Sequence, residues 1–343
     1  MRNYTQPVKT VLLALLSVAT VQVYAQNNIA ITSATSMTTG GSDNTLVGVG
    51  AGNLSMSGNG NLILGRGAGV LNSGGTQNSF VGSISGQQNS GGSYNSFFGY
   101  GSGAGNIDGN YNSFIGNGAG YTNDHGYNNF FGGYRSGYFN TAGHHNAFVG
   151  AGAGYANSTG TDNTFLGADA GGANTGGASN VFIGSQAGSA NSTGIQNTFI
   201  GTRSGLNTTV GGNTFIGYES GRANTTGGDN VFVGINAGKA NIGGSFNLFV
   251  GGNSGQANTS GQQNLFFGSG SGYTNTTGSF NSFIGINSGF NNLNGANNVF
   301  FGAQAGFSNT NGNYNMFLGH LQAIQTQQVF SIHLLETVQA TQM

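Results

Sequence analysis

The chain has 343 residues and a formal net charge of −1. Only 4% of its residues are charged, 68 are glycine, and cysteine and tryptophan are absent. The charged fraction is about a sixth of that in an average globular protein, and no Lys/Arg cluster could neutralise a nucleic-acid backbone. The lack of cysteine excludes a disulfide framework and any thiolate metal site. Aromatic residues make up 11% of the chain, which argues against disorder.

The first 25 residues have the features of a secretory signal peptide. A basic start is followed by an apolar run over residues 11–21, and Val23 and Ala25 occupy positions −3 and −1 of a cleavage site. The run is shorter than the roughly 20 residues that a membrane span needs, which disfavours a membrane anchor. We therefore predict that residues 1–25 are removed and that no membrane span follows. The mature protein is then secreted, or held at the bacterial cell surface (outer membrane).

A repeat with a period of seventeen occupies residues 44–319. Each copy contains Asn-x-Phe-(Ile/Val/Leu/Phe)-Gly, with Asn four positions before the Gly in all seventeen copies and Phe two positions before it in fifteen. A fainter copy, Asn27-Asn28-Ile29, lies one period before Asn44, within a predicted N-terminal cap or linker over residues 26–43. The repeat glycines are Gly48, Gly65, Gly82, Gly99, Gly116, Gly132, Gly150, Gly167, Gly184, Gly201, Gly217, Gly234, Gly251, Gly268, Gly285, Gly302 and Gly319.

Thirteen of the sixteen intervals between these glycines equal the period of seventeen. Of the other three, the intervals from Gly116 to Gly132 and from Gly201 to Gly217 are one residue shorter, and that from Gly132 to Gly150 is one residue longer. We interpret Gly133 as an inserted residue, and we place the two deletions after Gly126 and before Asn207. Turns absorb such changes of length, whereas stacked strands do not.

The composition of the repeat excludes a helix and favours stacked short strands. Glycine density and adjacent β-branched or aromatic residues oppose a helix, and a single copy is too short to bury its Phe alone. Stacking of successive copies buries it, so we predict an all-β parallel β-solenoid, or β-roll, of about 17 rungs with about 17 residues per rung. Three copies represent the structural repeat positions: Asn112, Phe114, Ile115 and Gly116; Asn197, Phe199, Ile200 and Gly201; and Asn281, Phe283, Ile284 and Gly285.

The Phe of each copy and the apolar residue that follows it must point to opposite faces of their strand. One of these columns fills the interior, and the residues leave open which one. The other forms an apolar stripe on the outside, which monomeric proteins rarely expose. We therefore expect a homo-oligomer whose copies pack along their length.

The repeat resembles that of a known family of adhesins. The copies Asn197-Thr-Phe-Ile-Gly201 and Asn281-Ser-Phe-Ile-Gly285, each followed by two residues and Ser-Gly, are similar to the head repeats of trimeric autotransporter adhesins (YadA-like heads). The resemblance covers about residues 27–319 and implies a left-handed parallel β-roll in which three chains pack together. Similar units occur in phage tail-fibre-like and secreted bacterial proteins. The present unit is longer than the adhesin head repeat, and the sequence shows no coiled-coil stalk or anchor barrel.

The repeat stops after Gly319, and residues 320–343 contain no glycine. One interpretation is a Gln-rich helix, such as the start of a stalk. The other is a single-base frameshift near codon 320. A shifted reading of permitted codons gives Phe-Ala-Gly, Asn-Thr-Thr-Gly and then Phe-Ile-Gly one full period after the last copy. We favour the frameshift, which predicts that this chain is a truncated reading of a longer repeat protein.

Motifs for catalysis and for cofactor or metal binding are weak. The His-His pair at 144–145 stands alone, whereas a metal site needs three or four converging ligands. The segment 234–239 (GINAGK) departs from a phosphate loop in its spacing and lacks the Ser or Thr after Lys. Asp108-x-Asn110-x-Asn112 resembles the start of a calcium loop but lacks its Gly and Glu. We therefore expect no enzyme activity, no cofactor and no metal ion.

Three functional hypotheses follow. The first is an exported, non-enzymatic surface fibre or adhesin head, in which repetition supplies length and avidity for an unidentified host or neighbouring-cell ligand. The second is a tail-fibre-like or extracellular structural rod. The third is a solenoid that binds ice or glycans through a Ser/Thr column on its turns. That column includes Ser192, Thr208, Thr225, Thr259 and Thr276.

Overall fold

A computed structural model describes residues 20–23, 28–32, 41–53, 55–320 and 332–334. These residues form a parallel β-solenoid of about 16 turns with 17 residues per turn, and they contain no helix. The predicted all-β solenoid is thereby confirmed. The chain divides into unit 1 (residues 1–162) and unit 2 (residues 163–343), which are described separately.

Each full turn contributes one strand of three residues. The strands of unit 1 are β1 (Thr20–Val23), β2 (Ile29–Thr32), β3 (Thr45–Val47), β4 (Leu62–Leu64), β5 (Ser79–Val81), β6 (Ser96–Phe98), β7 (Ser113–Ile115), β8 (Phe130–Gly132) and β9 (Ala147–Val149). The strands of unit 2 are β10 (Thr164–Leu166), β11 (Val181–Ile183), β12 (Thr198–Ile200), β13 (Thr214–Ile216), β14 (Val231–Val233), β15 (Leu248–Val250), β16 (Leu265–Phe267), β17 (Ser282–Ile284), β18 (Val299–Phe301), β19 (Met316–Leu318) and β20 (Ile332–Leu334).

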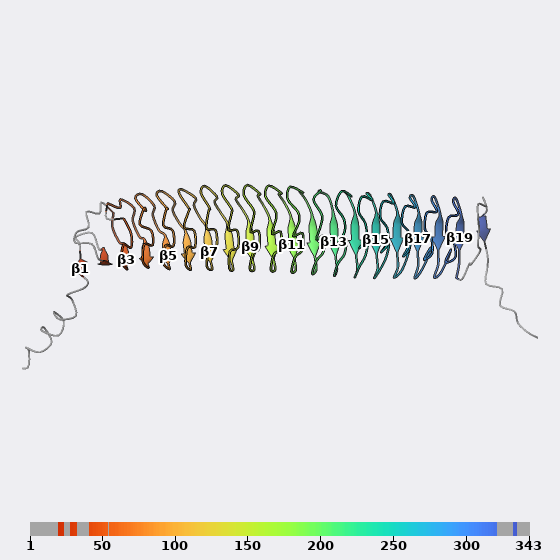
Figure 1. Ribbon diagram of the computed structural model, residues 1–343, viewed down its shortest axis with the longest axis horizontal. Helices are drawn as coiled ribbons and strands as arrows, with labels where there is room; N and C mark the ends of the chain where they lie inside the picture. The colour runs from red at the N-terminus through yellow and green to blue at the C-terminus, as the bar shows by residue number, and fades with distance from the viewer. Residues whose placement is uncertain (1–19, 24–27, 33–40, 54, 321–331, 335–343) are drawn as a thin grey trace, which may run out of the picture. The chain divides into compact units, whose positions relative to one another are not determined.

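Neighbouring strands from β2 to β9, and from β10 to β19, lie parallel and in matching register within their unit (Figure 1). Phe97 of β6 lies opposite Phe114 of β7, and Phe98 lies opposite Ile115. Because one turn of the solenoid is one copy of the repeat, every position of the repeat forms a column of equivalent side chains. Alternate residues of each strand point inward and outward.

The Phe column fills the interior. Phe114, Phe199 and Phe283 are fully buried, and the rings of successive turns are stacked, as for Phe97 and Phe114 with centroids 4.8 Å apart. The apolar residue after each Phe points outward, and Ile115 is 50% exposed. The structure therefore decides the question that the residues left open: Phe forms the core, and the column that follows it lies outside.

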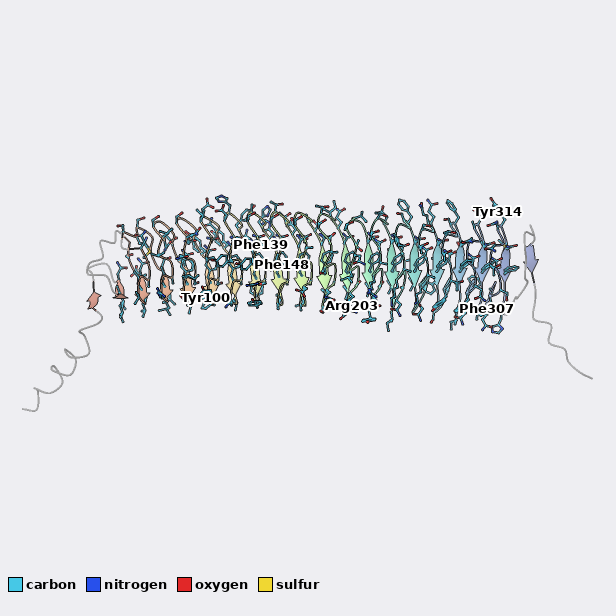
Figure 2. The ribbon with its side chains drawn as sticks, viewed as in Figure 1. Tyr100, Phe139, Phe148, Arg203, Phe307 and Tyr314 are labelled. Carbon is cyan, nitrogen blue, oxygen red and sulfur yellow. The ribbon has the colours of Figure 1, made fainter. Side chains whose placement is uncertain are left out.

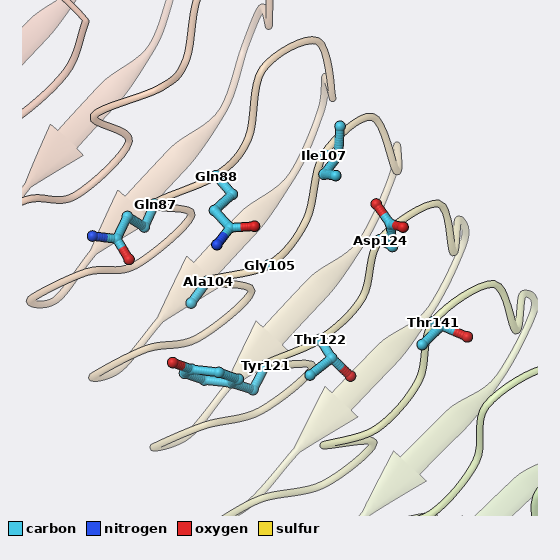
Figure 3. Close-up of a pocket in the computed structure, with 9 residues that line it drawn as sticks. All are labelled: Gln87, Gln88, Ala104, Gly105, Ile107, Tyr121, Thr122, Asp124 and Thr141. Carbon is cyan, nitrogen blue, oxygen red and sulfur yellow. The ribbon is translucent and has the colours of Figure 1, made fainter.

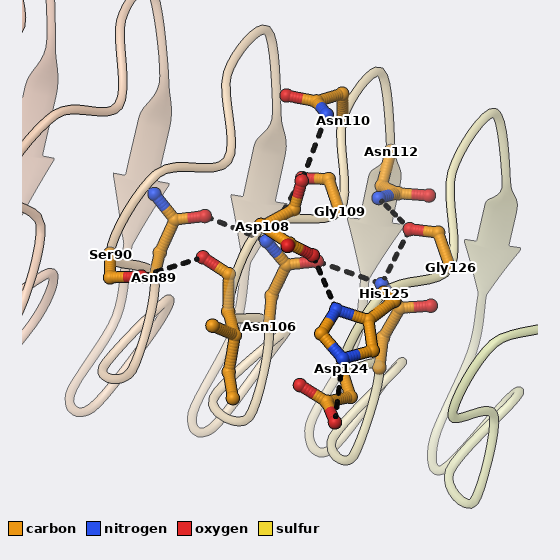
Figure 4. Close-up of polar contacts among 12 residues, drawn as sticks. Asn89, Ser90, Asn106, Asp108, Gly109, Asn110, Asn112, Asp124, His125 and Gly126 are labelled. Carbon is orange, nitrogen blue, oxygen red and sulfur yellow. Dashed lines mark hydrogen bonds and ion pairs between the residues drawn. The ribbon is translucent and has the colours of Figure 1, made fainter.

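Two columns of buried asparagine join successive turns (Figure 4). In the first column, the backbone N–H of Asn112 donates to Asn95 Oδ1 of the previous turn at 2.9 Å. In the second column, Asn123 Nδ2 donates to Asn106 Oδ1 at 2.7 Å. The two columns meet at one carbonyl, because Asn112 and Asn123 both donate through Nδ2 to Gly126 O at 2.8 Å. An amide side chain has the donors and the acceptor for all these bonds, which explains why Asn recurs at both positions.

Two glycine positions of each turn are closed to any side chain. Gly116 has a φ of +143°, and a Cβ there would lie 2.3 Å from the carbonyl oxygen of Gly133 on the next turn. Gly201 and Gly285 occupy the same column with φ of +132° and +134°. Gly120 lies against the core ring of its own turn, and a Cβ would come within 2.4 Å of that ring. Glycine is therefore required by both backbone conformation and close packing.

One copy has a different register from the one predicted. Strand β8 pairs with β7 so that Phe131 lies opposite Phe114 and Gly132 lies opposite Ile115. Gly133 thus takes the place of the repeat glycine, and the intervals on both sides of it equal the ordinary period. The predicted deletion after Gly126 and the predicted insertion are wrong. Adjacent Phe-Phe and Gly-Gly pairs permit either alignment on sequence grounds, and the burial of Phe131 decides between them.

The shortened interval between Gly201 and Gly217 is confirmed, but its missing residue lies elsewhere than predicted. Thr208 is fully buried in the second asparagine column, while Asn207 is exposed. The deletion therefore follows Thr208 and does not precede Asn207. Threonine has no amide to continue the ladder, so Thr208 Oγ1 and Asn191 Oδ1 are buried without a hydrogen-bond partner.

Both ends of the regular repeat are extended by a strand, at a spacing one residue shorter than the period. Strand β2 pairs with β3, and the backbone N–H of Asn44 donates to Asn28 Oδ1 at 2.8 Å, which centres the faint copy on Asn28. Strand β20 lies parallel to β19 with His333 opposite Phe317, so residues 332–334 are strand and not helix. Strand β1, within the predicted signal peptide, pairs antiparallel with β2. The rest of the signal peptide and of the tail lies outside the described residues. Signal cleavage and the frameshift stay predictions.

Replacing Thr208 with Asn should repair the interrupted ladder. The new amide can donate to Asn191 Oδ1 and accept from Asn224 Nδ2, two hydrogen bonds worth roughly 1 kcal/mol each. We expect Thr208→Asn to raise the thermal unfolding midpoint, measured by circular dichroism. Thr209→Asn changes the next residue of the same turn, which is exposed. It is the matched control and should not raise the unfolding midpoint. A lower midpoint for Thr208→Asn would show that the shortened turn, and not the missing amide, governs this site.

Candidate interaction surface

The representative repeat positions divide between the interior and the outside. Those that hold the turns together are buried: Asn112, Phe114, Asn197, Phe199, Asn281 and Phe283. Those that point outward on the strands are Ile115, Ile200 and Ile284. The repeat glycines beside them shape the turn that follows each strand. Surface function therefore lies with the outward columns and with the turns.

The outward side chains of the strands form a surface on each unit, which we call the strand face. It has two columns. The residue after each buried Phe is mostly apolar, and the residue before it is Ser or Thr on several turns, as at Ser113, Thr198 and Ser282. Phe267 and Phe301 on this face are 54% and 56% exposed. In unit 2 the column after Phe is apolar on every turn from β10 to β19: Leu166, Ile183, Ile200, Ile216, Val233, Val250, Phe267, Ile284, Phe301 and Leu318.

In unit 1, the apolar column after the buried residue has one interruption between β3 and β9. Its column after Phe comprises Val47, Leu64, Val81, Phe98, Ile115, Gly132 and Val149. At Gly132 the missing side chain is replaced by a neighbour, because the Phe130 ring lies 3.6 Å from where a Cβ of Gly132 would be. Phe130 is 43% exposed. The strand face thus stays apolar through this turn.

Aromatic side chains also gather on the turns. Figure 2 shows Phe307 and Tyr314 at opposite edges of unit 2. In unit 1, Tyr94 and Tyr111 lie on adjacent turns and stack with ring centroids 4.9 Å apart. The sequence hypotheses did not use these residues, because they stand at positions that the repeat leaves variable.

The Ser/Thr column expected on the turns is present only in part, because Ile242 and Leu293 interrupt it, and one of its predicted members lies elsewhere. Thr225, Thr259 and Thr276 each donate through Oγ1 to a backbone carbonyl of the next turn, at 3.2, 3.0 and 3.0 Å. Thr208 does not belong to this column, because it lies in the buried one, and Thr209 takes its place. These hydroxyl protons are therefore engaged within the solenoid.

A charged cluster in unit 2 was not predicted. Glu219 is buried, and its carboxylate lies 2.7 Å from Lys239 Nζ and 3.4 and 3.5 Å from Nη1 of Arg222 and Arg203. The hydrogen bond from Lys239 and the neighbouring positive charges hold the pKa of Glu219 below its usual value, against the opposing effect of burial. The repeat period could have revealed this cluster, since residues about one period apart lie on adjacent turns.

A polar cluster in unit 1 pairs histidine with aspartate (Figure 4). His125 Nδ1 bonds the Asp108 carboxylate, and His125 Nε2 lies 3.4 Å from Asp124 Oδ2. The hydrogen bond to Asp108 and the charges of both aspartates raise the pKa of His125. Asn110 donates to the backbone carbonyl of Asp108, while Asn112 is buried in the ladder. The residues that resembled a calcium loop therefore do not converge on one point.

The remaining motifs of the sequence have structural explanations. His144 and His145 contact each other, with 3.1 Å between their Nδ1 atoms. No group of three or more His, Cys, Asp or Glu side chains that could hold a metal ion occurs among the described residues. The segment 234–239 is a turn of the solenoid whose Lys239 contacts Glu219.

A shallow groove of about 290 Å³ lies on the turns of unit 1 (Figure 3). Its floor consists of Ala104 and Gly105, two small residues between the larger residues 87–88 and 121–122 of the adjacent turns. Asp124 supplies a carboxylate whose Oδ1 is buried without a hydrogen-bond partner. The volume is at the lower end for ligand sites, and the lining pairs no nucleophile with a base. We therefore assign no chemistry to this groove.

Comparisons with known proteins add no family. No protein-family model matches the chain, and a search of curated proteins finds no match. Within the described residues, no helical segment has the length and apolarity of a membrane span. The resemblance to adhesin head repeats therefore depends on the repeat residues alone.

Neutralising Glu219 should remove a contribution to stability that depends on pH. The pKa of Glu219 is lowered in the folded state. Its contribution to the free energy of unfolding is therefore complete above the pKa of the unfolded state, about 4.3, and is lost as the pH falls through the pKa of the folded state. We expect Glu219→Gln to destabilise the protein by roughly 1.5–3 kcal/mol at pH 7, measured by thermal unfolding. The difference from the wild type should shrink below about pH 4.

The matched control for this experiment is Asp169→Asn. Asp169 occupies the same column three turns earlier and is exposed. This control should leave the unfolding midpoint nearly unchanged at all pH values. An equal loss in both variants at pH 7 would contradict a specific role for the Glu219 cluster.

Proposed function

We propose that the chain is an exported, non-enzymatic fibre whose copies associate along their strand faces, and that it acts as an adhesin head or surface fibre. The strand face of unit 2 carries this proposal, because its outer column is apolar on ten consecutive turns from Leu166 to Leu318. Monomeric proteins rarely expose an apolar surface of this extent. Parallel strands that are apolar on both sides are normally covered on both sides.

A second copy of the chain is the occupant that best fits this face. The face is periodic, with one row of side chains about every 4.8 Å, and another copy presents rows at the same spacing. The outward positions of β10 to β19 carry no charged residue, so close approach requires no burial of charge. In this proposal three copies pack together in left-handed coils, as in the adhesin heads that the repeat resembles. Export depends on the signal peptide predicted for residues 1–25.

A structural rod of the tail-fibre type is the second candidate, and it uses the same strand face for assembly. The two functions differ in whether the turns bind a ligand. Binding of ice or glycans through the Ser/Thr column has less support. The hydroxyl protons of Thr225, Thr259 and Thr276 are donated to backbone carbonyls within the solenoid.

Lysine on the strand face should separate the copies. We expect the wild-type protein to be a trimer by light scattering coupled to size-exclusion chromatography. The double variant Ile200→Lys/Val233→Lys should be a monomer with an unchanged β-type circular dichroism spectrum, because a charge cannot be buried in the contact without a partner. The control Thr193→Lys/Ser260→Lys adds the same charge on exposed turns and should remain a trimer. A wild type that is monomeric at every concentration tested would refute self-association.

A further inference from the structure

One turn edge of unit 2 carries alternating aromatic and amide side chains, which we call the alternating edge. It comprises Phe246, Gln263, Phe280, Asn297 and Tyr314, one residue per turn. The five positions are equivalent, because each backbone N–H donates to a carbonyl of the preceding turn at 3.0–3.2 Å. Figure 2 shows Tyr314 at this edge.

The aromatic residues of the alternating edge are exposed and held in a costly backbone conformation. Phe246, Phe280 and Tyr314 are 58%, 56% and 59% exposed, with φ of 59°, 61° and 59°. The left-handed region costs a non-glycine residue roughly 1–2 kcal/mol, and a ring that stays more than half exposed recovers little of this through burial. Asn297 meets the same backbone requirement more easily. Folding alone therefore does not account for aromatic residues at these positions.

The spacing of these rings keeps them from covering one another. Adjacent turns are close enough for rings to stack, as the 4.7 Å between the core rings of Phe249 and Phe266 shows. Tyr94 and Tyr111, on adjacent turns of unit 1, stack in this way at 4.9 Å. The aromatic residues of the alternating edge are two turns apart, about 9.6 Å. An amide side chain stands between each pair of rings.

We propose that the alternating edge binds an extended, uncharged β-1,4-linked polysaccharide. The sugar rings of such a chain are flat, with apolar faces that stack on aromatic side chains and hydroxyl groups that bond to amides. Successive sugar rings face in opposite directions, so every second ring presents the same face. The polysaccharide advances per sugar ring by close to the distance between solenoid turns. Equivalent rings therefore meet Phe246, Phe280 and Tyr314, and the intervening rings meet Gln263 and Asn297.

The surroundings of the alternating edge suit a neutral ligand on a rigid surface. The residues that precede its members, Ser245, Gln262, Ser279, Ala296 and Asn313, are uncharged. Ser245 and Ser279 accept hydrogen bonds from backbone N–H groups of the preceding turn at 3.1 and 3.0 Å. Such bonds hold the turns in place before a ligand arrives. This inference rests on the adhesive part of the proposed function and names its ligand class.

The test is co-sedimentation of the full-chain protein with insoluble polysaccharides. Microcrystalline cellulose presents β-1,4-linked glucose, chitin presents β-1,4-linked N-acetylglucosamine, and amylose resin presents the α-linked counterpart. We expect binding to at least one β-1,4-linked polymer and not to amylose. Phe246→Asn/Phe280→Asn should bind at least tenfold more weakly. This variant should melt at the same or a higher temperature, because Asn suits the left-handed region, so the loss of binding cannot arise from unfolding.

Two further variants distinguish binding at this site from non-specific adsorption. Tyr94→Asn/Tyr111→Asn changes the same column in unit 1, where the rings stack on each other, and should bind as the wild type does. Gln263→Phe adds an apolar side chain that can stack on its neighbours and cover their rings. It should therefore bind at least tenfold more weakly, whereas non-specific adsorption would become stronger.

Several outcomes would overturn the proposal. They are no binding to either β-1,4-linked polymer, equal binding to amylose, and unchanged binding of Phe246→Asn/Phe280→Asn. Failure of this inference is distinguishable from failure of self-association. If the wild type is a trimer but binds neither β-1,4-linked polymer, only the polysaccharide site is refuted. If it is a monomer and binds one of them, only self-association is refuted.

Discussion

The hydrogen bonds of the buried asparagine columns are the constraint on which the solenoid depends. On most turns, two Asn side chains lie within about 3 Å of their hydrogen-bond partners on the previous turn. Both side chains also donate to one glycine carbonyl, as Asn112 and Asn123 do at Gly126. Met56 and Thr208 are buried in place of the second Asn, so a turn tolerates a change at this position at the loss of amide hydrogen bonds. Thr208 shows the consequence of a change, since its turn is one residue short and two buried polar atoms lack partners.

A repeated interior leaves the outside free to vary. The Phe rings, the asparagine ladders and the closed glycine positions fix the path of each turn, so the outward side chains are not needed to define the fold. In unit 2, variation in the strand-face column after the buried Phe stays within apolar residues, whereas the column before it also includes polar residues such as Thr198 and Ser282. Variation on the turns is wider and includes the Glu219 cluster, the pair of stacked tyrosines in unit 1 and the alternating edge.

The period and the fold class could be predicted from the sequence, because both depend on spacing and residue type alone. The register around Gly132 could not, because Phe-Phe-Gly-Gly fits two alignments and only the burial of Phe131 distinguishes them. The deletion was placed wrongly before Asn207 for a related reason. The repeat pattern favours Asn in the buried column, but the structure buries Thr208 there and leaves Asn207 exposed. The Glu219 cluster was predictable in principle from its spacing. The sequence could not predict that Phe points to the interior, because the inward side of a strand is defined only by the path of the whole turn around it.

Self-association and polysaccharide binding are compatible because they use different outward positions of unit 2. The strand face consists of strand residues such as Leu248, whereas the alternating edge lies on the turn that leads into each strand, as Phe246 does. The proposed contact between strand faces does not use the side chains of the alternating edge. Each added copy then brings another alternating edge, so a trimer would bind a fibrous polysaccharide surface through several weak contacts at once. Repetition along the chain acts in the same way, because a longer solenoid offers more aligned rings to one polysaccharide chain.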